Sequence, residues 1–229
     1  MIISHRHRFI FIKTQKTAGS SLEIALSRIC GPEDVITPLT HEEEEVRKAL
    51  GYRGCQNYII PFRQYKRLDW AKLAYFRKRV QFIEHASAAQ IQWYIDPDVW
   101  SSYFKFCFER NPWDKTVSYY YWHEGDKTHG SIRNFLETGE AGEMLGFNLY
   151  SRGGMPVVDK VFLYEDMPEA LQELSGRFNL KEPLTLPDFK AKGQVRKDRR
   201  HYREILSLEE QELIAKIFAR EIRYFSYSF

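Results

Sequence analysis

The nine residues 13–21, Lys-Thr-Gln-Lys-Thr-Ala-Gly-Ser-Ser, have the composition of an anion-binding turn. They follow a short apolar run, and their small side chains let backbone N–H groups face inward at the start of a helix, where phosphate or sulfate binds well. Lys16 supplies a point charge, and Ser20 and Ser21 supply hydroxyl donors. A plain strand-to-helix turn with an exposed lysine is equally compatible with these residues.

The same turn does not match the ATP- and GTP-binding pattern GxxxxGK[ST]. Its single glycine, Gly19, comes after Lys16 instead of before it. The mismatch counts against an ordinary ATPase or GTPase.

A second anion site is predicted around Arg110. Asn111 and Pro112 are typical of the N-cap and first position of a helix. The side chain of Ser118, in that helix, leans back toward the N-terminus and so toward the guanidinium. Arginine suits bidentate phosphate recognition, but Arg110 could instead pair with a carboxylate to stabilise the turn.

Hydrophobic periodicity indicates the elements that position these turns. Short aromatic and β-branched runs predict strands, and period-3.6 patterns predict helices. The expected strands are residues 9–12, 80–83, 103–108 and 160–164, and the expected helices are residues 22–27, 86–95 and 206–224 with two more beginning at 41 and 112. This alternation favours an α/β fold with a mainly parallel sheet. Ligands of such sheets bind beyond the carboxyl ends of the strands, here residues 13–21, 84–87 and 109–119.

The composition excludes several classes of protein. The chain has 229 residues, with 34 Lys and Arg against 31 Asp and Glu, a formal charge of +3. This balance argues against a dedicated nucleic-acid binder, and no apolar run is long enough to span a bilayer. Three cysteines, Cys30, Cys55 and Cys107, without CxxC spacing indicate neither a disulfide framework nor a zinc site. We expect one domain over residues 1–229 and a cytoplasmic location.

The two anion-binding segments resemble those of sulfotransferases that use 3′-phosphoadenosine 5′-phosphosulfate (PAPS). Residues 16–21 resemble the 5′-phosphosulfate loop, and Arg110-Asn111-Pro112 followed by Ser118 resembles the 3′-phosphate motif. Residues 82–88 are similar to the segment that holds a catalytic histidine in the carbohydrate branch, typified by heparan sulfate 2-O-sulfotransferase. Residues 163–166 and 218–225 resemble bacterial members.

The resemblance implies a three-layer fold like that of P-loop NTPases, with a central, mainly parallel sheet flanked by helices. It implies transfer of a sulfuryl group from PAPS to an acceptor hydroxyl, leaving 3′-phosphoadenosine 5′-phosphate (PAP), without a metal. The expected acceptor is a carbohydrate or glycoconjugate, and the expected source is bacterial.

Residue roles follow from the resemblance. Lys16 would stabilise the leaving phosphate, and Thr17, Ala18, Gly19, Ser20 and Ser21 would hold the 5′ end of the donor. Arg110 and Ser118 would hold its 3′-phosphate, assisted by Lys192, Gly193 and Arg196 from a basic run. His85 would be the general base, with Glu84 as its rival.

The chain departs from the family pattern at Gln15, where relatives often have proline, and at Leu22, where cytosolic members have a tryptophan that stacks on adenine. The membrane anchor and stem of Golgi relatives are not expected. Two other functions stay open: a non-catalytic nucleotide-binding module, and a small-molecule kinase with Asp114 or Asp166 as magnesium ligands.

Overall fold

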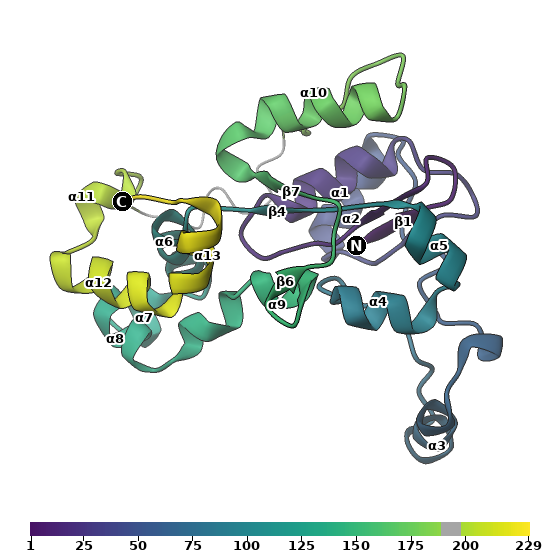
Figure 1. Cartoon of the computed structure of the whole chain (residues 1–229), viewed down its shortest axis with the longest axis horizontal. Coiled ribbons are helices and arrows are strands. Elements are labelled where there is room, and N and C mark those ends of the chain that lie inside the picture. The colour runs from purple at the N-terminus through teal and green to yellow at the C-terminus, as the bar shows by residue number, and fades with distance from the viewer. Residues whose placement is uncertain (189–197) are drawn as a thin grey trace.

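Five strands form a mixed sheet at the centre of the computed structural model, which describes residues 1–188 and 198–229 (Figure 1). The strands are β1 (Ile2–Ser4), β2 (Phe9–Phe11), β3 (Val35–Ile36), β4 (Phe104–Glu109) and β7 (Lys160–Leu163), in the order β3-β1-β2-β4-β7. Strand β4 runs parallel to β2 and β7, whereas β1 runs antiparallel to β2 and β3.

The prediction of a mainly parallel sheet is therefore wrong. Strand β1 was not predicted, and only the turn at residues 5–8 joins it to β2. A link this short allows an antiparallel hairpin, since a parallel pair needs a crossover of a dozen or more residues. The α/β class itself is confirmed.

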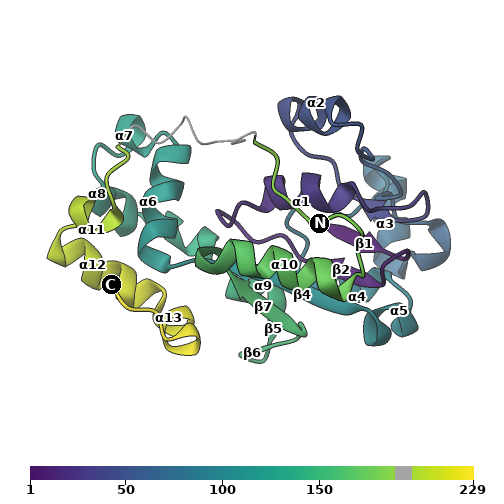
Figure 2. The same ribbon diagram turned by 90° about the horizontal axis from the view of Figure 1, so that it is seen from above.

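Alternation of side chains along the strands builds two separate cores. Phe9, Phe11, Phe106 and Phe108 project from one face and pack under α1 (Gly19–Ser27) and α10 (Met167–Arg177). Ile10 and Cys107 project from the other face, which α4 (Ala88–Tyr94) and α9 (Phe147–Tyr150) cover. The sheet thus lies between two helical layers, as Figures 1 and 2 show.

A third core lies among helices beyond the carboxyl end of β4, at the end of the molecule opposite α5 (Pro97–Ser102). Its helices are α6 (Pro112–Trp122), α7 (Gly125–Thr128), α8 (Ile132–Glu137), α11 (Tyr202–Ile205), α12 (Leu208–Ile217) and α13 (Ala219–Phe225). Asn111 caps α6 and Pro112 begins it, as predicted. The remaining elements are α2 (His41–Ala49), which begins where predicted, α3 (Arg67–Phe76), the hairpin β5 (Ser151–Arg152) and β6 (Met155–Pro156), and 3₁₀ turns at Phe62–Gln64, Glu140–Met144 and Tyr164–Asp166.

Two further predictions are corrected. Residues 80–83 form no strand of the sheet. Their backbone groups bond instead to residues 58–60, which leaves a single bridge between Ile59 and Gln81. The expected helix over residues 206–224 is two helices, α12 and α13. The break falls at Phe218, which leaves helical geometry (φ −102°, ψ 24°) and buries its ring completely in the third core.

None of the helices in the two described ranges is both long and apolar enough to cross a bilayer.

A buried ion pair joins the sheet to the helices of the third core. Glu109 ends β4, and its Oε1 lies 2.6 Å from Nζ of Lys115 on α6, with both side chains 1% exposed. Tyr150 donates to the second carboxylate oxygen at 3.0 Å. A Cβ at Gly146 would lie 2.6 Å from that same oxygen, so only glycine fits beside the pair.

Replacing Lys115 by methionine leaves the Glu109 carboxylate buried without a cation. We expect Lys115→Met to lower the free energy of unfolding by about 3–5 kcal/mol in urea titrations. The double variant Glu109→Gln/Lys115→Met removes both charges, so its free energy of unfolding should fall clearly less. Equal losses in both variants would contradict the electrostatic explanation.

Candidate functional site

The loop between β2 and α1 presents an uncapped helix start. Lys16 (φ 60°) and Ala18 (φ 58°) adopt left-handed backbone conformations, which non-glycine residues adopt mainly at binding sites and tight turns. Ala18 is the N-cap of α1, no side chain in the described residues caps the helix, and its first turn has no acidic residue. No acidic residue of the first turn offsets the positive end of the helix dipole.

Lys13, for which the sequence predicts no role, lies beneath this loop and connects it to α1 and to Glu84. The side chain is 3% exposed, and its amino group pairs with Glu23 of α1 at 3.3 Å and with Glu84. It also donates to the Ser20 hydroxyl at 3.1 Å. A Cβ on Gly19 would lie 2.7 Å from Cγ of Lys13, so glycine lets the lysine pass under the start of the helix. The Lys13–Glu23 pair has a signal in the sequence: a lysine directly follows an apolar strand, and a single glutamate lies within an otherwise apolar helix.

The threonines of the loop turn inward. Thr17 is buried, and its hydroxyl lies 3.0 Å from that of Thr14. The Thr14 hydroxyl in turn donates to the backbone carbonyl of Phe108, near the end of β4. These bonds fix the loop against the sheet, so its groups for a ligand are backbone N–H groups, Lys16 and the half-buried Ser21.

The Arg110 turn contacts the Lys16 turn directly. Nη1 of Arg110 donates to the backbone carbonyl of Lys16 at 2.9 Å. Nε and Nη2 donate to one oxygen of Asp114 at 2.9 and 2.5 Å, and the guanidinium lies 4.2 Å from the centroid of the Tyr164 ring. The carboxylate partner that the sequence left open is thus present. These bonds leave part of the fork of N–H donors for a ligand.

Helix α6 presents one stripe to these turns. Asp114, Ser118 and Trp122 recur every four residues and so share a face. Arg110 holds Asp114 at one end, and the Lys16 amino group lies 4.8 Å from the centroid of the Trp122 ring at the other. Ser118, half-buried, therefore lies on the face of α6 that meets both turns.

His85 is joined to the same loop through Lys13. Its Nδ1 lies 2.9 Å from the backbone carbonyl of Lys13. A carbonyl only accepts, so Nδ1 carries the hydrogen and Nε2 of the neutral ring has the lone pair. Burial lowers the pKa of His85 below 6.5; the bond to the carbonyl opposes this shift, and the Lys13 charge reinforces it. The shift favours the neutral ring, and the Glu84 carboxylate is engaged by Lys13.

Three predicted donor contacts, Lys192, Gly193 and Arg196, lie outside the described residues. Of the kinase candidates, Asp114 is engaged by Arg110. Within residues 1–188 and 198–229, no three His, Cys, Asp or Glu side chains gather in a way that could hold a metal ion.

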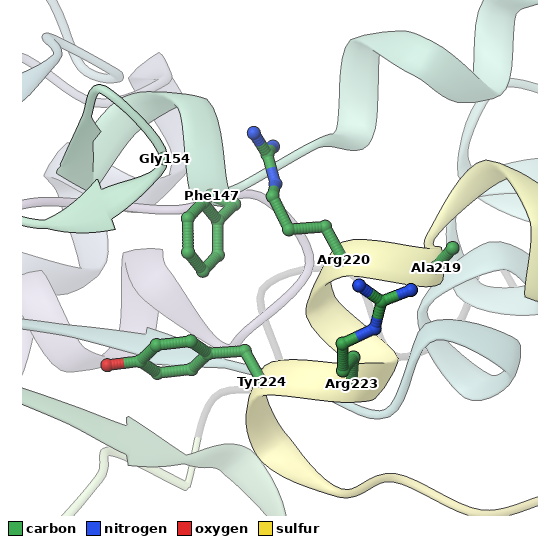
Figure 3. Close-up of a pocket in the computed structure, with 6 residues that line it drawn as sticks. All are labelled: Phe147, Gly154, Ala219, Arg220, Arg223 and Tyr224. Carbon is green, nitrogen blue, oxygen red and sulfur yellow. The ribbon is translucent and has the colours of Figure 1, made fainter.

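A separate cavity of about 600 Å³ opens between α9, the β5–β6 turn and α13. Figure 3 shows the rings of Phe147 and Tyr224 and the side chains of Arg220 and Arg223 around it. Arg220 packs 4.3 Å from the centroid of the Phe147 ring and donates to Asn148 at 2.8 Å. Two cations beside two rings suit an anionic ligand with a flat apolar part. No sequence pattern predicts this cavity, because its walls come from segments about 70 residues apart, around Phe147 and Arg220.

Comparison with known proteins identifies one relative and no established activity. No protein-family model matches the chain. A protein of Archaeoglobus fulgidus, described as uncharacterized, is 34% identical over 95 residues, 39% of this chain and 79% of the archaeal protein. The chain belongs to the same family as this archaeal protein. Since the description of that relative names no activity, the assignment of chemistry depends on the site itself.

The environment of His85 predicts its titration. In proton NMR, we expect the His85 ring to titrate with a midpoint below 6.5, because burial disfavours the imidazolium. The His85→Gln spectrum assigns the resonance. The unfolded chain takes up this proton at higher pH than the folded chain, so the stabilisation is complete above pH 6.5 and is lost as the pH falls through the folded pKa. A midpoint at or above 6.5 would contradict a neutral, buried ring.

Proposed function

We propose that this protein is a PAPS-dependent sulfotransferase with the sulfotransferase version of the α/β fold, acting on a hydroxyl of a carbohydrate or glycoconjugate. The observation that carries the proposal is the hydrogen bond from Arg110 to the Lys16 carbonyl, which puts two anion-suited turns side by side. One nucleotide with phosphate-like groups at both ends can contact both turns. His85, held by the carbonyl of Lys13 in the first turn, adds a base to the same rim of the sheet.

The donor is bound mainly by charge-assisted hydrogen bonds. Its 5′-phosphosulfate faces the N–H groups at the start of α1, residues 17–21, with the Ser21 hydroxyl as a further donor. Its 3′-phosphate takes the remaining N–H donors of Arg110 and the Ser118 hydroxyl. Each such bond contributes about 1.5–3 kcal/mol. The family resemblance extends this site to Lys192, Gly193 and Arg196.

The transfer step is an in-line displacement at sulfur. The acceptor oxygen forms a bond to sulfur as its proton passes to Nε2 of His85. The bond from sulfur to the bridging oxygen breaks, and its electron pair stays on the phosphate of PAP. Lys16 neutralises the charge that develops there, since catalysis of this type rests on positioning and electrostatics.

The two alternatives differ in what they require. A nucleotide-binding module needs the Lys16 and Arg110 turns but not His85, and a kinase needs carboxylates for magnesium. Thermal-shift measurements with PAPS, with ATP and with ATP plus magnesium show which of these nucleotides the protein binds. Incubation with labelled PAPS and a panel of glycans and glycolipids then tests transfer. A shift with ATP plus magnesium but none with PAPS would overturn the proposal.

Arg110 is expected to recognise the 3′-phosphate. Wild-type protein should bind PAP more tightly than AMP, which lacks that phosphate. Arg110→Ala should weaken PAP binding by about tenfold or more, with AMP binding nearly unchanged. Calorimetry measures both affinities, and Arg133→Ala, which removes an exposed arginine paired with Glu137 on α8, is the control. Equal weakening for both nucleotides would instead indicate a structural effect on the Lys16 turn.

Lys16 and His85 are expected to act in turnover. Lys16→Ala should lower the transfer rate by about 10²–10³-fold, and His85→Gln by about 10²–10⁴-fold, with PAP affinity reduced far less by the second change. The exposed Lys127→Ala serves as the control for loss of a lysine. Loss of turnover in Glu84→Gln together with full turnover in His85→Gln would reassign the base to Glu84.

A further inference from the structure

An arm of the molecule, residues 62–79, projects from the body with α3 at its end (Figure 1). We call this segment the basic arm. It exposes a group of large apolar side chains that no core uses: Phe62 (48%), Leu68 (74%), Trp70 (49%), Tyr75 (82%) and Phe76 (62%). Phe62 stacks on Trp70, and Tyr75 contacts Phe76 edge to face, so exposed rings gather in pairs along the arm. Large exposed apolar surface marks an interaction site.

The arm is also strongly basic. It contains seven cationic residues, namely Arg63, Lys66, Arg67, Lys72, Arg77, Lys78 and Arg79. Its one acidic residue, Asp69, is buried and accepts from the Lys66 backbone N–H and the Tyr94 hydroxyl, each at 2.9 Å. The formal charge of the arm is 7 − 1 = +6, against +3 for the whole chain.

Anchoring of one face of α3 turns another face outward. Asp69 is held by Tyr94 of α4, whereas Leu68 and Tyr75, seven residues apart, share a neighbouring face about a quarter of a turn away, which is exposed. Cations lie beside the rings around them: the Lys66 amino group is 5.3 Å from the ring centroid of Trp93. The Arg79 guanidinium is 4.6 Å from that of Phe62. Exposed apolar side chains and cations thus alternate along the arm.

This mixture fits an anionic lipid surface better than other partners. Apolar and aromatic side chains enter the interface of a bilayer while Lys and Arg remain at the headgroups. A second copy of this chain docked arm to arm would bring two charges of +6 together, which like-charge repulsion opposes. A nucleic acid would satisfy the cations but would gain little from the aliphatic side chain of Leu68.

We propose that the basic arm docks this protein on the surface of an anionic bilayer, with Leu68, Tyr75 and Phe76 entering the interface and Arg77, Lys78 and Arg79 contacting the headgroups. The docking site is separate from the Lys16 and Arg110 turns. The docking proposal is therefore independent of whether the protein transfers sulfuryl groups.

Co-sedimentation of the full-length protein with vesicles tests the proposal. Binding is expected to vesicles of phosphatidylcholine and phosphatidylglycerol in equal parts, to be much weaker to phosphatidylcholine alone, and to decrease as salt is added. Leu68→Ser and Tyr75→Ser should each weaken binding by about tenfold. The triple variant Arg77→Glu/Lys78→Glu/Arg79→Glu should abolish it.

Matched controls change equally exposed residues elsewhere. Leu208→Ser removes a leucine that is 77% exposed on α12, and Lys181→Glu reverses an exposed charge. Both should bind vesicles like the wild type, and unchanged thermal melting verifies that every variant is folded. Wild-type protein that binds neither vesicle, or binds both equally, overturns the proposal. The proposal is also overturned if the arm variants leave vesicle binding unchanged but abolish a dimer or an RNA complex.

Discussion

The candidate site depends on the ion pairs and the hydrogen bond of one buried amino group, that of Lys13. An ammonium out of water is costly unless carboxylates and hydrogen bonds compensate it. Lys13 obtains this compensation from Glu23 on α1, from Glu84 and from the Ser20 hydroxyl, while its own carbonyl holds the ring of His85. One buried charge thus determines where the helix start and the histidine lie relative to β2. Gly19 makes this arrangement possible because a side chain there would collide with Lys13.

The second constraint is that Arg110 serves two purposes. Its bond to the Lys16 carbonyl holds two loops from neighbouring strands together, and its pairing with Asp114 orients the guanidinium. The backbone N–H of Asn111 donates to Glu165 at 2.7 Å, which fixes the turn from the side of β7. Because these partners are preorganised, an anion entering between the turns meets donors that are already in position. The same pairing with Asp114 limits how much positive charge the arginine presents.

The modest net charge conceals an uneven distribution. The basic arm has a formal charge of +6, so the remainder of the chain has 3 − 6 = −3. Much of the charge around the candidate site is internally compensated, as in the Lys13 and Lys115 pairs. The arm is hydrogen-bonded to α4 and lies apart from α6, which carries Ser118 and follows the Arg110 turn (Figure 1). The proposed surface docking and the proposed chemistry at the strand ends therefore involve separate parts of one chain.

The sequence by itself determined the features that depend on neighbouring residues. These are the alternating strand that became β4, the start of α2 at His41, the Asn111 cap and the anion-suited composition of residues 13–21. Its prediction of one domain over residues 1–229 stays a prediction. Only the tertiary structure decided the antiparallel β1, the bridge at Gln81, the break at Phe218 and the central position of Lys13. The physical reason is that strand direction and buried ion pairs depend on partners far along the chain, whereas caps and periodicity depend on residues within a few positions.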